Sequence, residues 1–387
     1  MPEPRRRRRA KKIEQVEKEK KEKPIHEQFS ESAKSARKPR TININDLVPT
    51  GITLLNCCLS DNAFGGFQKG KITTVPGPSQ SGKSIVVCSA LAACAHNSNL
   101  NNYDLIYDDI EEAKEFDMDY LFSEKTNKRV EAPRYDKDKD PIYSNTVQDL
   151  ESNIISRCNQ VSCKPFIYIA DTLDALTEEE EVVKEYQNAL LRAKDSYAIK
   201  DIKEAFAGNK AYVIGRMLRN VKGLLKKTGS VLIMVQQERT KMGATGWQKQ
   251  YTTSGGKAPY YYSTHQVRLI NAGEIKDKGM VLGNKLKASV VKNKLNGKKR
   301  DCEFCVYNDL GVDDVASCVD FLCKDYWKSL PKHPNTYEAS EIDFQGSKIK
   351  IIEHIEANQL EKQMQEAVNT AWNLKEEAAL LGRQRRF

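Results

Sequence analysis

The sequence predicts an α/β protein with a central, mostly parallel twisted sheet flanked by helices, followed by a small α+β region ending in an amphipathic helix. Strand-like and helix-like segments alternate from residue 42 onward. A glycine-rich turn joins one of these strands to a helix, and the pattern changes after residue 315. A chain of 387 residues with 39% hydrophobic content allows one large domain or two modest ones, which excludes collagen-like and fully disordered proteins.

The elements follow one another in the order expected of such a fold. Strands are predicted at 71–75, 105–108, 166–171, 230–235, 267–270, 286–291 and 302–307. Helices are predicted at 83–96, at 147–159 and over 177–227, with a break around 207–209. From residue 350, apolar residues recur at helical spacing and predict a packing face.

Charge and the pattern of predicted elements divide the chain into three parts. Residues 1–40 hold 15 Lys and Arg against 7 Asp and Glu, so they carry most of the net charge of +9. We expect a basic, disordered arm over 1–40, an α/β core over 41–314 and a C-terminal α+β region over 315–387. The arm is either a solvated tail with a charge-paired helix over 14–22, or an electrostatic arm for nucleic acid or a targeting receptor.

Cysteine usage and hydropathy predict an intracellular protein. No run approaches the roughly 18 apolar residues that a membrane span requires, and residues 1–9 lead into further charged residues where a secretory signal would have an apolar core. The ten cysteines are scattered through apolar runs, which predicts reduced, buried thiols. A four-thiolate metal site is the alternative, although its second half has the wrong spacing; it would use Cys302, Cys305, Cys318 and Cys323.

The strongest motif is a phosphate-binding loop between the strand at 71–75 and the helix at 83–96. It fits G-x-x-x-x-G-K-[ST], in which backbone N–H groups and the helix N-terminus hold phosphates. Lys83 is expected to reach the β- and γ-phosphates of ATP, and the Ser84 hydroxyl to bind Mg²⁺. The predicted ATP-binding residues of the loop are Gly77, Pro78, Ser79, Gln80, Ser81, Gly82, Lys83 and Ser84.

Two acidic positions complete the predicted nucleotide site. Asp171 ends the apolar strand 166–171, where a carboxylate would share the Mg²⁺ with Ser84. The acidic cluster 108–112 follows another strand and offers a group to activate water. Glu111 is the first choice as the catalytic residue, and spacing alone does not separate it from Asp109 and Glu112.

Three further segments, taken with this element order, resemble the RecA family of strand-exchange recombinases, and most closely its divergent bacteriophage members, the UvsX-like proteins. The segments are 235–243 (Val-Gln-Gln-Glu-Arg-Thr-Lys-Met-Gly), 252–257 (Thr-Thr-Ser-Gly-Gly-Lys) and 290–294 (Val-Val-Lys-Asn-Lys). The resemblance covers about residues 45–312 and implies a RecA-like P-loop ATPase core.

The resemblance implies roles for residues outside the phosphate loop. Gln237 matches the family's γ-phosphate sensor, which leads into a DNA-binding loop over 242–257. In this loop the glycines allow movement, the lysines supply positive charge, and the aromatic residues can stack on bases. The predicted DNA-binding residues are Lys241, Gly243, Trp247, Lys249, Tyr251, Gly255, Gly256 and Lys257. A first DNA loop is expected within 178–210.

Lys292 and Lys294 match the family's pair of basic residues that reach the neighbouring protomer's ATP. Residues two apart on a strand face the same side, so both could approach one ligand; an exposed basic strand edge is the alternative. The sequence departs from the family at the catalytic glutamate, expected two residues after Asp108 where Ile110 stands. A one-residue insertion would bring Glu111 into that place.

Together these features imply a DNA-dependent ATPase that uses ATP and Mg²⁺. The family's members form helical filaments on single-stranded DNA and pair it with homologous duplex DNA in recombination and repair, and mediator or single-strand-binding proteins are further partners. The expected location is the cytoplasm, of a bacterial host for a phage protein, or the nucleus of a eukaryote. The alternatives are a hexameric RecA-like helicase, a RecA-like regulatory ATPase acting on proteins and, with less support, a small-molecule P-loop kinase.

Overall fold

The computed structural model describes residues 42–112, 116–160, 163–179, 181–182, 206–240, 251–253 and 255–380. Ile42–Asn369 form one compact unit. Residues 370–380 are the described part of a second unit that also contains Met1–Thr41. The predicted arm over 1–40, the helix over 14–22 within it and most of the predicted first DNA loop lie outside the described residues.

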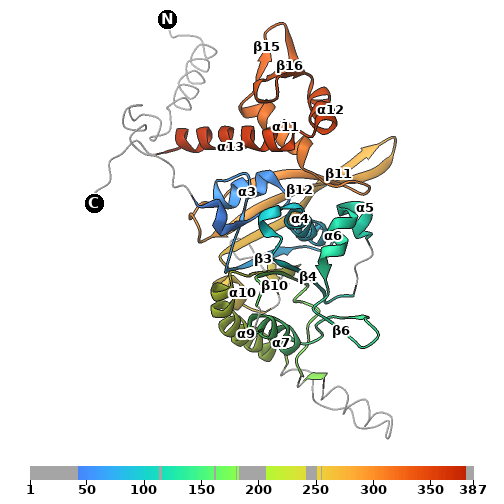
Figure 1. The fold of residues 1–387 in the computed structure, drawn as a ribbon, viewed down its shortest axis with the longest axis vertical. Coiled ribbons are helices and arrows are strands. Elements are labelled where there is room, and N and C mark those ends of the chain that lie inside the picture. The colour runs from blue at the N-terminus through green and yellow to red at the C-terminus, as the bar shows by residue number, and fades with distance from the viewer. Residues whose placement is uncertain are drawn as a thin grey trace, which may run out of the picture. The chain divides into compact units, whose positions relative to one another are not determined.

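A ten-stranded sheet forms the centre of the first unit, in the order β14-β13-β12-β11-β3-β9-β8-β4-β5, with β10 paired to β9 (Figure 1). The strands from β11 to β5 are parallel, and β12, β13 and β14 continue the sheet in antiparallel fashion. The predicted, mostly parallel sheet is therefore confirmed. Its strands are β3 (Ile72–Gly77), β4 (Asp104–Asp109), β5 (Val130–Glu131), β8 (Phe166–Asp171), β9 (Val231–Thr240), β10 (Tyr251–Thr253), β11 (His265–Asp277), β12 (Met280–Asn293), β13 (Asp301–Tyr307) and β14 (Gly311–Asp313).

Helices cover both faces of this sheet (Figure 1). One face carries α4 (Lys83–His96), α5 (Met118–Phe122) and α6 (Glu124–Arg129). The other carries α7 (Val147–Cys158), α9 (Phe206–Thr228) and α10 (Ala258–Tyr262). Apolar residues of α7 and α9 pack on fully buried strand residues such as Phe166 and Tyr168. A continuous apolar strand covered on both faces is typical of parallel sheets.

Local sequence signals account for several element boundaries. Thr146 and Asp149 form a capping box at the start of α7, each side chain accepting a backbone N–H of the other. Predicted and observed bounds agree for the helix at Lys83–His96 and the strand at Phe166–Asp171. The expected break around 207–209 is wrong, because α9 begins at Phe206 and continues through it.

The hairpin of β11 and β12 is much longer than the predicted strands 267–270 and 286–291. Its outer part is exposed on both faces, so it lacks the alternation between buried and exposed residues by which a strand is recognised. Glycine at 283 is explained by packing, since a Cβ there would lie 2.2 Å from the carbonyl oxygen of Val306.

Smaller elements surround the main sheet. Residues from Asp314 to Asn358 form a small α+β group, and the proposed domain boundary at 314/315 remains a prediction. The single expected C-terminal helix is two helices, since Gln359 adopts the left-handed conformation between them. The elements are β1 (Leu47–Val48), β2 (Phe67–Gln68), α3 (Thr53–Ser60), β6 (Arg134–Tyr135), β7 (Pro141–Ile142), α11 (Asp314–Asp325), β15 (Lys328–Leu330), β16 (His333–Ala339), β17 (Phe344–Gly346), α12 (Lys348–Asn358) and α13 (Glu361–Ala378).

All ten cysteines lie in the described residues and are free thiols, as expected, but only seven are buried, since Cys158, Cys163 and Cys305 are partly exposed. Burial raises the pKa values of the Cys57 and Cys318 thiols, and Cys302 is hydrogen-bonded to Cys58. Within the described part of the chain, no group of three or more His, Cys, Asp or Glu residues is placed to hold a metal ion. No helix in that part is long and apolar enough to cross a membrane.

Candidate functional site

The phosphate loop connects the carboxyl end of β3 to the first turn of α4. Gly77 is required by its surroundings, because a Cβ there would lie 2.6 Å from the carbonyl oxygen of Leu269. Gly82 caps α4 with φ of 71°, a left-handed conformation that glycine adopts without steric cost. Inside the turn, the carbonyl oxygen of Pro78 accepts hydrogen bonds from Ser81 Oγ at 2.8 Å and from Lys83 Nζ at 2.7 Å.

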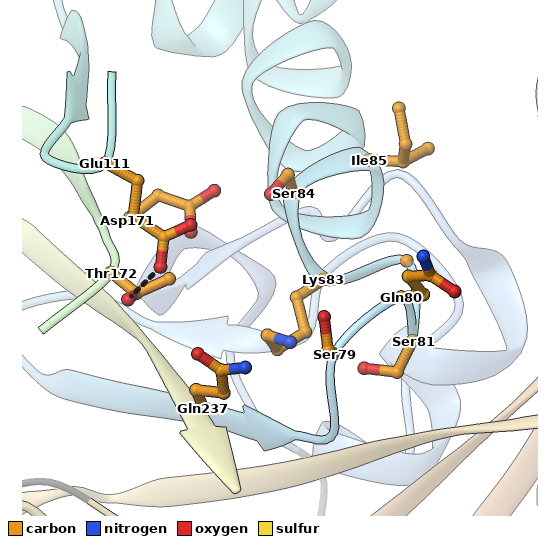
Figure 2. Close-up of a pocket in the computed structure, with 11 residues that line it drawn as sticks. Ser79, Gln80, Ser81, Lys83, Ser84, Ile85, Glu111, Asp171, Thr172 and Gln237 are labelled. Carbon is orange, nitrogen blue, oxygen red and sulfur yellow. Dashed lines mark hydrogen bonds between the residues drawn. The ribbon is translucent and has the colours of Figure 1, made fainter. Parts of the chain in front are cut away.

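A cavity of about 310 Å³ lies over this loop, at the carboxyl edge of the parallel strands (Figure 2). Residues from four separate parts of the chain meet there because β3, β4, β8 and β9 are neighbours and end at the same edge. The lining residues are Ser79, Gln80, Ser81, Gly82, Lys83, Ser84, Ile85, Glu111, Asp171, Thr172 and Gln237. The structure thus brings together the loop, the strand-end aspartate, the preferred glutamate and the sensor glutamine that the sequence predicted separately.

Asp171 is buried at the end of β8 and lies beside the loop. Its Oδ2 accepts a hydrogen bond of 2.9 Å from the Tyr107 hydroxyl, and its carboxylate is also hydrogen-bonded to Ser84. Burial raises the pKa of Asp171, while the hydrogen bonds from Ser84 and Tyr107 oppose that change. A carboxylate and a hydroxyl in contact are both oxygen donors, so this pair fits the ligand preference of Mg²⁺.

Lys83 is held among acidic groups. Burial lowers the pKa of Lys83, and the carboxylates of Asp171 and Glu111 act in the opposite direction. The carboxylates keep the Lys83 ammonium group charged although it is partly buried. Because water screens a partly buried charge less, Lys83 is suited to bind phosphate.

The structure separates the acidic residues 108–112 that sequence spacing could not. Asp108 is fully buried, and its Oδ2 accepts hydrogen bonds from Ser144 Oγ at 2.7 Å and from the Tyr168 hydroxyl at 2.6 Å. It points into the protein on the side of α7. Glu111 lines the cavity, where its Oε1 accepts a 2.8 Å hydrogen bond from Thr172 Oγ1 (Figure 2). Neither Asp109 nor Glu112 is among the lining residues.

Gln237 reaches the cavity from β9, where it is paired in register with Gly77 of β3. Its backbone N–H donates to Asp174 Oδ2 at 2.7 Å, which ties β9 to the turn after β8. The next residue, Glu238, accepts hydrogen bonds of 2.8 to 3.0 Å from the Arg268 guanidinium of β11. Arg268 in turn lies over the Tyr251 ring, 4.4 Å from its centroid, so a chain of contacts leads from the cavity to β10.

Half of the predicted DNA-binding residues lie in the described part of the chain. Tyr251 is exposed in β10, which pairs antiparallel with the end of β9. Gly255 and Gly256 have φ of 81° and 63°, and Lys257 is the N-cap of α10. These residues return the chain from the loop to the α10 face of the sheet. The other predicted residues, Lys241, Gly243, Trp247 and Lys249, lie outside the described residues.

Lys292 and Lys294 do not line the cavity of their own protomer. Lys292 Nζ donates to the carbonyl oxygen of Tyr260 and lies 4.3 Å from that ring's centroid, while Lys294 Nζ donates to the Tyr261 carbonyl at 2.8 Å. Burial and the neighbouring Lys294 lower the pKa of Lys292 to about 8. Both lysines therefore contact the same helix, α10, and not the cavity over the phosphate loop.

Sequence reasoning missed two side chains that hold the site's carboxylates. Thr172 donates to Glu111, and Tyr107 donates to Asp171. Thr172 directly follows the predicted metal ligand, so its position was a usable signal. No signal in the sequence pointed to Tyr107, because it resembles any other strand residue. Its closeness to Asp171 follows only from the register of β4 with β8.

Residues 140–313 of the chain match the model of the RecA N-terminal domain family. The chain is 27% identical to Protein RecA of Lactobacillus acidophilus over 297 residues, which cover 76% of this chain and 72% of that protein. It is 24% identical to Protein RecA of Helicobacter hepaticus over 297 residues, covering 77% and 76%. It is 25% identical to Protein RecA of Wolinella succinogenes over 300 residues, covering 77% and 75%. The chain is thus similar to these proteins over about three quarters of its length, and the α/β domain described above is RecA-like.

Proposed function

We propose that the chain is an ATP-dependent DNA recombinase of the RecA-like type, which forms filaments on single-stranded DNA and promotes homologous pairing and strand exchange. One observation carries this proposal. Gln237 lines the nucleotide cavity on the strand that leads directly into the glycine- and lysine-rich segment 241–257. A change at the nucleotide can therefore bias the conformation of that segment through a single strand.

The residues of the cavity divide the work of an ATPase among them. Bound ATP with Mg²⁺ supplies the phosphoryl group that is transferred to water. The loop 77–84 and Lys83 hold the phosphates, and Ser84 with Asp171 provides the oxygen ligands for the metal ion. Glu111, oriented by Thr172, holds and deprotonates the attacking water.

Lys292 and Lys294 act on the ATP of the neighbouring protomer. Their separation from the cavity of their own chain supports this role, as does their position side by side at the end of β12. Positive charge supplied from a neighbour stabilises the transferring phosphoryl group, which couples hydrolysis to assembly on DNA. Strand exchange itself requires no covalent chemistry by the protein.

Finer assignments belong to the same proposal. The resemblance of the sequence implies four finer assignments. They are the bacteriophage UvsX-like type, the use of Mg²⁺, mediator or single-strand-binding partners, and a cytoplasmic location in a bacterial host. The shorter, divergent form of the family pattern in this sequence supports the phage type. The helicase and regulatory ATPase alternatives are less well supported, since the three relatives described above are named RecA.

The rate of ATP hydrolysis with and without single-stranded DNA tests this function. We expect single-stranded DNA to stimulate hydrolysis, and the protein to form open helical filaments with a slowly hydrolysed ATP analogue in negative-stain images. Closed rings that unwind duplexes would identify a helicase instead. No response of hydrolysis to DNA would overturn both readings and favour a regulatory ATPase.

A further inference from the structure

Asp174 lies in the turn after β8 and connects the nucleotide cavity to the base of the predicted first DNA loop, 178–210. Its Oδ2 accepts a hydrogen bond of 2.7 Å from the backbone N–H of Gln237, the residue that lines the cavity from β9. Its backbone carbonyl oxygen accepts one of 2.9 Å from Nζ of Lys210, near the start of α9. One residue thus contacts both the strand that carries the nucleotide sensor and the helix that follows the loop.

The turn that carries Asp174 is held on both sides. The Leu173 N–H donates to the carbonyl oxygen of Val235 at 3.1 Å, which fixes the turn to β9. The Thr177 N–H donates to the carbonyl oxygen of Asn145 at 3.0 Å, which fixes it to the segment before α7. The backbone of Asp174 therefore has a firm support. A displacement of either of its partners changes the contacts of its side chain and leaves the turn in place.

Lys210 depends on nearby carboxylates for its charge. Burial lowers the pKa of Lys210, and the carboxylate of Asp174 makes the largest contribution in the opposite direction, ahead of Glu181 and Glu178. The hydrogen bond from Lys210 nevertheless goes to the carbonyl oxygen of Asp174 and not to its carboxylate. A direct contact between the ammonium and the carboxylate would join opposite charges in a partly buried place, where their attraction is greater than in water.

The carboxylate of Asp174 has one oxygen available for such a contact. Among the described residues, Oδ1 is buried and has no hydrogen-bond partner, whereas Oδ2 accepts from Gln237. Burial of a carboxylate oxygen without a partner is unfavourable. The side chain therefore has two competing arrangements. In the one described here it is bound to Gln237, and in the other it is bound to the ammonium of Lys210.

We propose that Asp174 is a positioning residue that transmits the state of the nucleotide site to the first DNA loop, by exchanging its contact with Gln237 for one with Lys210. The inference rests on the proposed recombinase function. When the Gln237 side chain is drawn to the γ-phosphate, its backbone N–H moves off Oδ2. The carboxylate then binds Lys210 and shifts the start of α9, where the loop ends. The second loop responds to the same phosphate directly through β9.

The test uses the full chain and variants of the two partners. Asp174→Asn keeps the size of the side chain and an oxygen acceptor for the Gln237 N–H, but it lacks the charge that attracts Lys210. Lys210→Met removes the ammonium and keeps the helix propensity of lysine. The double variant shows whether the two residues act through one contact. Lys125→Met, at an exposed position of α6, removes the same charge elsewhere and is the matched control.

Hydrogen exchange, followed by mass spectrometry on peptides from 183–205 and 241–250, is measured on single-stranded DNA with and without a slowly hydrolysed ATP analogue. We expect the analogue to slow exchange in both segments of the wild type and of the Lys125→Met control. In Asp174→Asn and in Lys210→Met, the slowing within 183–205 should fall about tenfold, within the range of typical coupling between sites. The slowing within 241–250 should remain. The double variant should lose no more than either single variant.

Three results would overturn the proposal. The first is a segment 183–205 that does not respond to the analogue in the wild type, or that responds equally in the wild type and the variants. The second is an equal loss in both segments, which would mean that Asp174 only supports β9. The third is a pair of losses that add up in the double variant. A wild-type protein whose ATP hydrolysis ignores single-stranded DNA would instead refute the recombinase function.

Discussion

Glu111 and Asp108 are three residues apart and have opposite surroundings. Glu111 is exposed at the cavity and receives one hydrogen bond from Thr172, whereas Asp108 is enclosed and receives hydrogen bonds from Ser144 and Tyr168. A carboxylate that acts on water must reach solvent and substrate, so only Glu111 of this pair suits catalysis. Asp108 holds α7 and its preceding turn against the sheet.

Replacing Glu111 tests the first of these roles. We expect Glu111→Gln to lower the rate of ATP hydrolysis about 100-fold, the size of effect typical of losing a general base. Affinity for ATP, measured with a fluorescent analogue, should stay within a factor of a few. Glu112→Gln is the matched control and should hydrolyse ATP at the wild-type rate. If the two variants lost activity equally, Glu111 would have no specific role.

Replacing Asp108 tests the second role. Asp108→Ala leaves the Ser144 N–H and the hydroxyls of Ser144 and Tyr168 without their acceptor. We expect the free energy of unfolding to fall by about 3 kcal/mol, since each buried unsatisfied group costs about 1 to 3 kcal/mol. Chemical denaturation measures this loss. Unchanged stability accompanied by loss of hydrolysis would mean that Asp108, and not Glu111, acts on the nucleotide.

At this scale the sequence predicted most of the residues that line the site, but not Ile85 or Thr172, and it did not predict how the carboxylates are assigned. The spacing of Gly77, Gly82 and Lys83 is sufficient, because a phosphate loop is local in sequence. The roles of Asp108 and Glu111 depend on contacts with Ser144 and Thr172, which come from other elements. Such contacts follow from strand order, which the sequence does not state.

Strand β12 and helix α10 are the two elements that we propose face a neighbouring protomer. Lys292 has a pKa of about 8, lowered by burial and by Lys294, and it lies against Tyr260. A lysine whose pKa is lowered is charged below that pKa and loses its proton as the pH rises through it. Contact with a neighbour's phosphates stabilises the charged form and raises the pKa again.

The pH dependence of hydrolysis tests this element. We expect stimulation by single-stranded DNA to fall at a pH above 8, because Lys292 becomes neutral only above the pKa that the neighbour's phosphates have raised from about 8. Lys292→Arg should remain stimulated to higher pH, because a guanidinium keeps its charge there. Comparison of the two pH profiles is the measurement. Identical profiles would show that the charge of Lys292 does not limit the reaction.

Elements with a buried face were predicted well, and elements without one were not. The strand at Phe166–Asp171 and the helix at Lys83–His96 were located correctly because their apolar patterns reflect the core. The outer half of the β11–β12 hairpin is exposed and gave no pattern. The two C-terminal helices were merged because the break at Gln359 depends on backbone conformation and not on apolar spacing.

At the scale of the whole molecule, most of the net charge lies in residues 1–40 and not in the core that is proposed to bind DNA. Residues 1–40 carry most of the charge of +9, while the remainder is nearly neutral. We therefore expect binding of DNA by the core to depend on a few focused lysines near 241–257. We expect residues 1–40 to contribute a general electrostatic attraction that ATP does not control.

Deleting residues 1–40 separates these contributions. We expect the salt dependence of DNA binding to become shallower, because fewer counterions are released, while ATP still increases affinity. A salt titration with and without a slowly hydrolysed ATP analogue gives both quantities. Loss of the ATP effect would place the arm in the interface between protomers.

Mixing two inactive variants tests most directly the central claim that each nucleotide site is completed by a neighbour on DNA. One variant carries Glu111→Gln and keeps its lysines; the other carries Lys292→Ala and Lys294→Ala and keeps Glu111. In an equal mixture on single-stranded DNA, about a quarter of the interfaces join an intact cavity to an intact lysine pair, so ATP hydrolysis should recover to about that fraction of the wild-type rate. A mixture no more active than the separate variants would contradict the claim.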